Sequence, residues 1–122
     1  MDRLKRRADF LATAGGARAH ATPFLVQARD RGDRGSPRVG LTVTKKSGNA
    51  VERNRIRRRL RSAADDVVTR AGRQGFDYVV IARRAALVAP FDAMLRDLER
   101  AIVRVHADKA GQGPGRSAGP KA

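Results

Sequence analysis

The chain has 122 residues and a formal net charge of +15 at pH 7, an excess that favours a nucleic acid over an anionic membrane surface as its partner. It has no cysteine and two histidines, which excludes disulfides, thiolate chemistry and a metal site built from cysteine or several histidines. No apolar run approaches the roughly 20 residues of a membrane span, and the charged first ten residues lack the apolar stretch of a secretion signal, so we expect a cytoplasmic protein with no membrane partner.

Residues 3–14 predict a short helix. Leu4, Ala8 and Leu11 share one face at helical spacing, and we expect that face to be buried. Phe10 projects from a different side of the helix. Two interpretations of Phe10 stay open: it packs under a neighbouring loop, or it is an exposed platform on which a base can stack.

Two strands are predicted next, over residues 23–29 and 38–44. In the second strand Val39, Leu41 and Val43 alternate with small or polar residues, so that one face is apolar. The segment between the strands is rich in Gly, Asp and Pro, which is typical of a turn. We therefore expect the two strands to pair as a hairpin.

Residues 45–61, with the sequence KKSGNAVERNRIRRRLR, are the most informative part of the chain. Asn49 is a good helix N-cap, and Glu52 stands where it can complete a capping box. We predict a helix over residues 50–71. Its apolar positions fall within a sector of about 100°, namely Ile56, Leu60, Ala63, Ala64, Val67 and Ala71.

This helix carries two basic surfaces. One flanks the apolar stripe and consists of Arg53, Arg57 and Arg61, with Asn54 beyond them. The other faces outward and consists of Arg55, Arg58 and Arg59. A solvated helix usually mixes its charges, whereas so one-sided a run destabilises the free protein and indicates that a polyanion neutralises it.

The rest of the chain predicts one strand, one helix and a tail. Residues 77–83 form a near-continuous apolar run, typical of a strand that is buried on both faces, and we expect it to pair in parallel with residues 38–44. A helix begins near Ala89 and Pro90. We expect residues 1–108 to form the single domain, and residues 109–122 to be a disordered basic tail.

No catalytic constellation emerges from the sequence. It has no HExxH, CxxC, GxSxG or P-loop pattern. Asp65 and Asp66 are neighbours on a helix and point about 100° apart, so we interpret them as solvated charges that offset nearby arginines. Asp77 lies beside a predicted turn, where an aspartate has a local role. The lone His20 and His106 are interpreted as structural or surface residues.

The 45–61 segment resembles the signature of the bacterial ribonuclease P protein subunit. That signature joins a Lys-Lys pair to Gly-Asn-Ala-Val and then to an Arg-Asn-Arg core, which here is Arg53-Asn54-Arg55. The resemblance extends along most of the chain, because RLKRRADF resembles the opening helix of the family, VGLTVTKK its strand before the signature and YVVIARRAA its last strand.

The resemblance implies an α+β fold: a single-domain α/β sandwich of order αβββαβα. Its central sheet is mixed and four-stranded, and one of the four is a short strand near residues 17–22. The basic helix lies in a left-handed crossover between parallel strands. Right-handed crossovers are the general rule, so this handedness follows from the resemblance alone.

The resemblance also implies the function. The protein subunit binds the catalytic RNA and the 5′ leader of precursor tRNA, and it assists the removal of that leader without needing a protein partner. The RNA and its Mg²⁺ ions carry out the hydrolysis, and no metal is assigned to the protein. The alternatives are a general RNA-binding or ribosomal protein, a DNA-binding protein that reads the major groove, and a protein-only nuclease.

Site residues follow from the family signature together with the helical wheel. The expected leader-binding residues are Phe10, Arg53, Asn54, Arg57 and Arg61. The expected residues facing the catalytic RNA are Lys45, Lys46, Arg55, Arg58 and Arg59. The chain departs from the family at Ala14 and near Gln27, where aromatic residues are expected, and each lost base–aromatic stack could cost ~1–3 kcal/mol.

Overall fold

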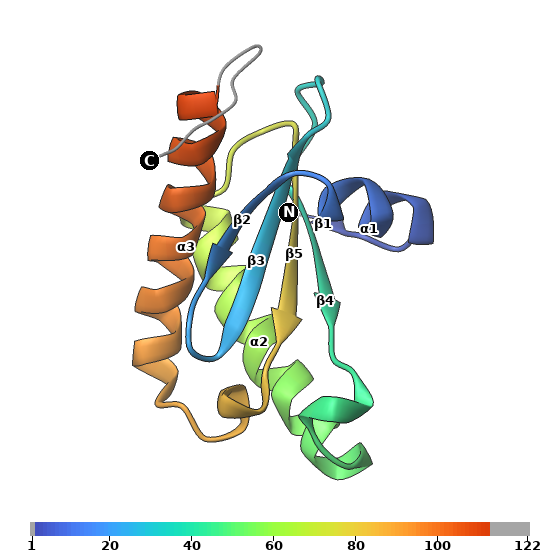
Figure 1. Ribbon diagram of the computed structural model, residues 1–122, viewed down its shortest axis with the longest axis vertical. Coiled ribbons are helices and arrows are strands. Elements are labelled where there is room, and N and C mark those ends of the chain that lie inside the picture. The colour runs from blue at the N-terminus through green and yellow to red at the C-terminus, as the bar shows by residue number, and fades with distance from the viewer. Residues whose placement is uncertain (1, 113–122) are drawn as a thin grey trace.

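The computed structural model describes residues 2–112, which form one five-stranded mixed sheet and three α-helices (Figure 1). The strands are β1 (Asp2–Arg3), β2 (Ala17–His20), β3 (Phe24–Asp30), β4 (Arg38–Thr42) and β5 (Phe76–Ala82), in the spatial order β1-β4-β5-β3-β2. The helices are α1 (Arg7–Ala14), α2 (Ala50–Ala71) and α3 (Phe91–Gln112), with short 3₁₀ turns η1 (Lys45–Ser47) and η2 (Arg84–Leu87).

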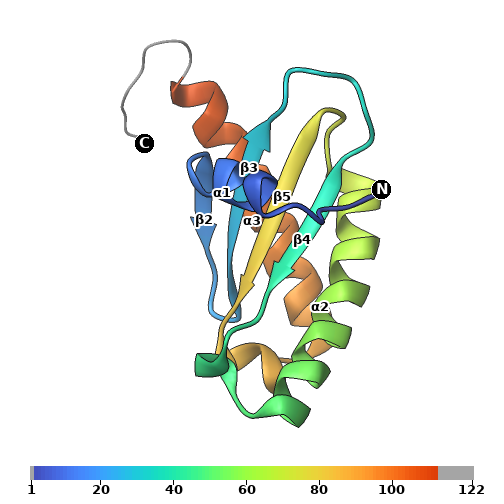
Figure 2. The same ribbon diagram turned by 90° about the vertical axis from the view of Figure 1, so that its right-hand side faces the viewer.

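The predicted α/β sandwich is confirmed. Helices α2 and α3 cover one face of the sheet, and α1 lies on the opposite face (Figures 1 and 2). β4 and β5 pair in parallel, as predicted, and α2 connects them. In Figure 2 both strands point downward, β5 lies to the left of β4 and α2 lies behind the sheet, which makes the crossover left-handed.

The hairpin predicted between residues 23–29 and 38–44 is wrong. β5 lies between β3 and β4, antiparallel to the first and parallel to the second. The hairpin of this fold is instead the antiparallel β2–β3 pair, which confirms the short strand implied near residues 17–22. Because β5 is buried, its backbone N–H and C=O groups need a hydrogen-bonding strand on each side. It therefore lies between β3 and β4, which are consecutive in the sequence.

The N-terminal helix is shorter than predicted and buries a different face. Residues 2–3 pair with β4 as the fifth strand, so the order is βαβββαβα, and α1 begins at Arg7. Leu4 is buried, but Leu11 is 61% exposed and Ala8 is exposed, so the predicted apolar stripe is wrong. Contacts with the sheet decide the orientation of so short a helix.

Helix α2 has the bounds and the cap that the sequence predicts. The Asn49 side chain accepts a hydrogen bond from the Glu52 backbone N–H, and the Glu52 carboxylate accepts one from the Asn49 N–H, both at 2.9 Å. Arg84 binds the Glu52 carboxylate at 3.0 Å and lowers the pKa of that group. The predicted apolar stripe packs on the sheet, with Ile56, Leu60, Ala63, Ala64 and Val67 buried.

Helix α3 packs beside α2 and contributes the buried residues Met94, Leu98, Ile102 and Val105 to the core. It extends to Gln112, into the segment predicted as a tail, and residues 113–122 lie outside the described residues. No helix within residues 2–112 is long and apolar enough to cross a membrane.

A hydrogen bond of 2.6 Å between the Tyr78 hydroxyl and His106 Nε2 joins β5 to α3. Both side chains are buried, which agrees with the structural interpretation of His106. Burial lowers the pKa of His106 from 6.5 to about 4, because the charged imidazolium loses its hydration.

The buried imidazole predicts a pH dependence of stability. Below pH 6.5 the unfolded chain binds a proton at His106 that the folded protein does not bind until about pH 4, so stability is full above 6.5 and falls on acidification. Between pH 7 and 5 we expect the free energy of unfolding to fall by about 2 kcal/mol through this group. Urea unfolding at each pH measures it.

His106→Gln should flatten this part of the profile, and His20→Gln, on an exposed residue of β2, is the matched control and should leave it in place. An equally steep profile for His106→Gln would contradict the assignment.

Candidate nucleic-acid interface

A cavity of about 140 Å³ lies between α2 and the β4 edge of the sheet. Parts of the chain that are far apart in sequence build its walls: the N-terminal strand, α1, β4 and the middle of α2. It is lined by Arg3, Leu4, Phe10, Val39, Gly40, Leu41, Arg57, Arg61, Ala64 and Asp65. The residues of β4 thus make an apolar wall, while Arg57 and Arg61 of α2 and Arg3 of β1 supply positive charge.

Phe10 reaches this cavity from α1. Its ring lies directly over Gly40, since a Cβ atom added there would be 2.5 Å from the ring atoms Cε1 and Cζ. The side chain is half-buried. Phe10 thus packs against the strand β4, rather than under a neighbouring loop, and also borders the cavity.

The expected leader-binding residues are partly brought together. Arg57 and Arg61 line the cavity with Phe10. Asn54 is linked to them, because its side-chain oxygen accepts a hydrogen bond of 3.0 Å from Arg57. Arg53 is not among the lining residues and lies one turn nearer the start of α2, where its Nε is 3.4 Å from the Asn49 carbonyl oxygen.

The outward face of α2 forms a second, shallower depression. It is lined by Arg55, Arg58, Arg59, Ser62 and Phe91. Arg59 is not free there, because its guanidinium donates to the carbonyl oxygens of Ala86 at 2.9 Å and Leu87 at 2.8 Å. Arg59 therefore holds the end of η2 against α2, a structural task that the helical wheel does not show.

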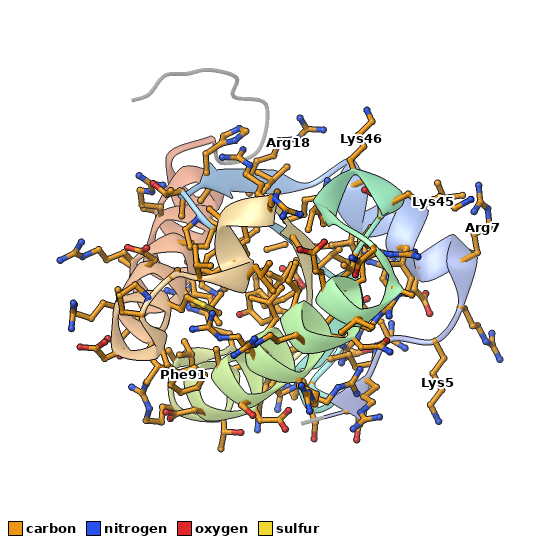
Figure 3. All side chains as sticks on the ribbon, turned by 90° about the horizontal axis from the view of Figure 1, so that it is seen from below. Lys5, Arg7, Arg18, Lys45, Lys46 and Phe91 are labelled. Atoms are coloured by element: carbon orange, nitrogen blue, oxygen red, sulfur yellow. The ribbon has the colours of Figure 1, made fainter. Side chains whose placement is uncertain are left out.

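Lys45 and Lys46 lie in the η1 turn rather than at a strand end, because β4 stops at Thr42. Both are exposed. In Figure 3 Lys45 and Arg7 lie at the right of the molecule, Lys46 at the top and Lys5 at the lower right, whereas Phe91 lies at the lower left. The chain near the start of α1 thus adds to the basic surface.

Asp77 is the buried acidic centre of the sheet. The sequence interpretation gave it a local role beside a turn, but its side chain is 0% exposed. Arg29 and Arg38 are its register partners on β3 and β4. Arg29, Arg31 and Arg38 each bind its carboxylate at 2.7 Å.

These guanidinium groups outweigh the desolvation of the Asp77 carboxylate and lower its pKa from 3.8 to about 2. The resulting stabilisation is present above pH 3.8 and is lost as the pH falls toward 2. The network fixes the ends of three strands relative to one another. It thereby fixes the surface on which α1 lies.

The carboxylates of the described residues offer no site for a metal ion. Within residues 2–112 no three His, Cys, Asp or Glu side chains are placed to hold a metal ion together. Asp66 pairs with Arg70 at 2.7 Å, as a charge that offsets an arginine should, and Asp65 lines the cavity.

Sequence reasoning missed several residues of the interface. Arg3 and Gly40 line the cavity, and neither was predicted as a site residue. A usable signal existed for Gly40, since a glycine inside an apolar strand often marks a close approach by another group. Arg3 carried no such signal, because the strand that places it is two residues long.

An aromatic ring and three arginines line one cavity of a strongly basic α/β sandwich, an arrangement typical of proteins that bind single-stranded nucleic acid. A family model described as Ribonuclease P matches residues 1–106, and the chain belongs to this family. It is therefore the protein component of ribonuclease P, the accessory subunit of an endoribonuclease that matures tRNA, and its partner is the RNA of that enzyme.

Relatives and solved structures agree with this assignment. The chain is 49% identical over 109 residues to the ribonuclease P protein component of Ruegeria pomeroyi, with 87% of each chain covered. It is similar to the Staphylococcus aureus RNase P protein, with 30% identity, a TM-score of 0.70 and coverage of 86% and 97%. It is also similar to the Thermotoga maritima RNase P protein, with 27% identity, a TM-score of 0.70 and coverage of 86% of this chain and 98% of that one. The family predicted from the signature is confirmed.

Because the Phe10 ring packs on Gly40, we expect the effects of mutating the two residues on stability to be coupled. A methyl group at position 40 would meet the Phe10 ring at 2.5 Å, so Gly40→Ala should destabilise the protein by about 1–3 kcal/mol through overpacking. In a Phe10→Ala background the same change should cost much less. Urea unfolding of the four proteins in this double-mutant cycle measures the coupling.

Gly15→Ala is the control, because its added methyl group would make an ordinary contact of 3.6 Å. Equal costs of Gly40→Ala in both backgrounds would show that Phe10 does not rest on Gly40.

Proposed function

We propose that the chain holds the single-stranded 5′ leader of precursor tRNA in the cavity between α2 and β4, and that it assists the endonucleolytic removal of that leader. The observation that carries the proposal is the convergence of Phe10, Arg57 and Arg61 on one cavity from two helices on opposite faces of the sheet.

The chemistry of the cavity suits an unpaired strand. Guanidinium groups bind phosphate oxygens in a forked geometry, and an aromatic ring can stack on any base for ~1–3 kcal/mol. Phe10 is the aromatic residue among the ten residues that line the cavity. Gln27, near the position where the family places another aromatic, is 5% exposed. Leader binding here therefore depends more on the arginines than on stacking.

The outer face of α2, where Arg55 and Arg58 are exposed, is proposed to contact the catalytic RNA. Lys45 and Lys46 are proposed to add a second contact from η1, on another side of the molecule. Arg59 contributes indirectly, by holding η2 against α2. Leader and catalytic RNA would then use different flanks of the same helix.

Hydrolysis is proposed to depend on Mg²⁺ held by the RNA subunit. Mg²⁺ takes several oxygen ligands in octahedral geometry, and the carboxylates near the cavity do not fit that need. Asp9 and Asp77 face arginines, and Asp65 is a single carboxylate on the cavity wall. The part of this chain is to bind and orient the substrate, and the proposal places it in the cytoplasm with its RNA partner.

Cleavage of precursor tRNA at low Mg²⁺ tests this function. The reaction contains the cognate catalytic RNA alone, the RNA with this protein, or the protein alone. The RNA with protein should cleave faster than the RNA alone, and the protein alone should not cleave. Absence of stimulation would contradict the proposal, and cleavage by the protein alone would place an active site in this chain.

Mutations on the two flanks of α2 should weaken binding to different RNAs. Arg61→Ala should weaken holoenzyme binding to precursor tRNA more than to mature tRNA, because mature tRNA has no leader. Arg58→Ala should weaken assembly with the catalytic RNA and reduce the slope of log affinity against log salt by about 1. Fluorescence titrations at several salt concentrations measure both. Equal losses for precursor and mature tRNA with Arg61→Ala, or an unchanged salt slope with Arg58→Ala, would refute the respective assignment.

A further inference from the structure

Helix α1 carries Phe10 but has little of its own to hold it in place. It is eight residues long, and its N-cap residue, Arg6, makes no side-chain capping hydrogen bond. Thr13 is its one buried residue. A helix of this length is marginal in isolation, so contacts with the sheet must set its position.

Asp9, in the first turn of α1, supplies a charged contact with the sheet. One carboxylate oxygen of Asp9 lies 3.5 Å from Arg29 Nη2 and the other lies 3.6 Å from Arg38 Nη1. Both distances are longer than the 2.7 Å contacts that the same arginines make with Asp77. Arg29 and Arg38 therefore bind Asp77 closely and make longer contacts with Asp9.

Arg29 and Arg38 are held in place by Asp77, so their contacts with Asp9 can set the position of α1. Asp77 is 0% exposed, while Asp9 is 21% exposed and each of the two arginines is 28% exposed. Partly buried pairs of this kind are screened less by salt than exposed ones. Two guanidinium groups thus connect the buried Asp77 to Asp9 in the first turn of α1.

We propose that Asp9 is a positioning residue for leader recognition: through Arg29 and Arg38 it fixes α1 on the sheet, and so holds the adjacent Phe10 over Gly40 at the cavity. The proposal rests on the proposed function, since it assigns Phe10 to the leader. It also extends the binding site to a residue that does not line the cavity.

The sign of the effect separates this role from simple electrostatics. Asp9 places a negative charge near a surface that binds RNA, so its neutralisation should strengthen binding if charge alone mattered. A positioning role predicts the opposite for precursor tRNA. A role restricted to the helix dipole, which Asp9 also has from its place in the first turn, would act on stability without preference for the leader.

The test compares holoenzymes assembled with wild-type protein, Asp9→Asn, Phe10→Ala and the double variant. For each, the affinities for precursor tRNA, for mature tRNA and for the catalytic RNA are measured at one salt concentration. Asp66→Asn is the matched control, because it removes a carboxylate from an arginine pair on α2. Asp9→Glu keeps the carboxylate and should retain the preference for precursor tRNA.

Asp9→Asn should weaken precursor tRNA binding about fivefold, the lower end of the range for one lost base stack, with mature tRNA binding and assembly unchanged. In the Phe10→Ala background it should add no further loss, and Asp66→Asn should weaken neither tRNA.

Unchanged or tighter precursor binding by Asp9→Asn would overturn the proposal, and so would a full additional loss in the Phe10→Ala background. Loss of assembly together with leader binding would also overturn it, by making Asp9 a general stability residue. Phe10→Ala without any effect on precursor binding would instead contradict the leader-binding role of Phe10, and hence the proposed function.

Discussion

The architecture depends on one buried charge, the carboxylate of Asp77, and on the three arginines that surround it. A buried carboxylate is costly unless ion pairs and hydrogen bonds compensate for its lost hydration, and here they lower its pKa to about 2. Since the partners come from β3, β4 and the segment after β3, the requirement fixes the end of β3 relative to the starts of β4 and β5. Removing one arginine would leave a buried charge under-compensated, so the cluster acts as a unit.

In the proposed function, the same sheet lets one helix contact two RNAs. Helix α2 buries its apolar stripe against the strands, which directs Arg57 and Arg61 to one flank and Arg55 and Arg58 to another. The capping box at Asn49 and the ion pair between Glu52 and Arg84 fix where the helix begins. The basic side chains therefore point in two different directions, and in the proposed function the charge that would destabilise a free protein binds two different RNAs.

Local features were predictable from the sequence, and features that depend on distant partners were not. The cap and apolar period of α2 lie within one segment, so its bounds were predicted correctly. The choice of β5 as the neighbour of both β3 and β4 depends on a segment that follows much later in the chain, and the hairpin prediction failed there. Asp77 was interpreted as a turn residue because its arginines come from other strands. Likewise, the carbonyl groups that bind Arg59 belong to η2, which a helical wheel does not contain.

Photo-crosslinking of a precursor tRNA that carries 4-thiouridine in its leader, bound to the assembled holoenzyme, tests the leader site most directly. If the leader lies between α2 and β4, mass spectrometry should find the crosslinks within residues 3–14, 38–42 and 57–65, which supply the cavity walls. Crosslinks confined to the outer face of α2 around Arg58, or to α3, would contradict this placement. A mature tRNA with the same nucleotide at its 5′ end should give none of the cavity crosslinks.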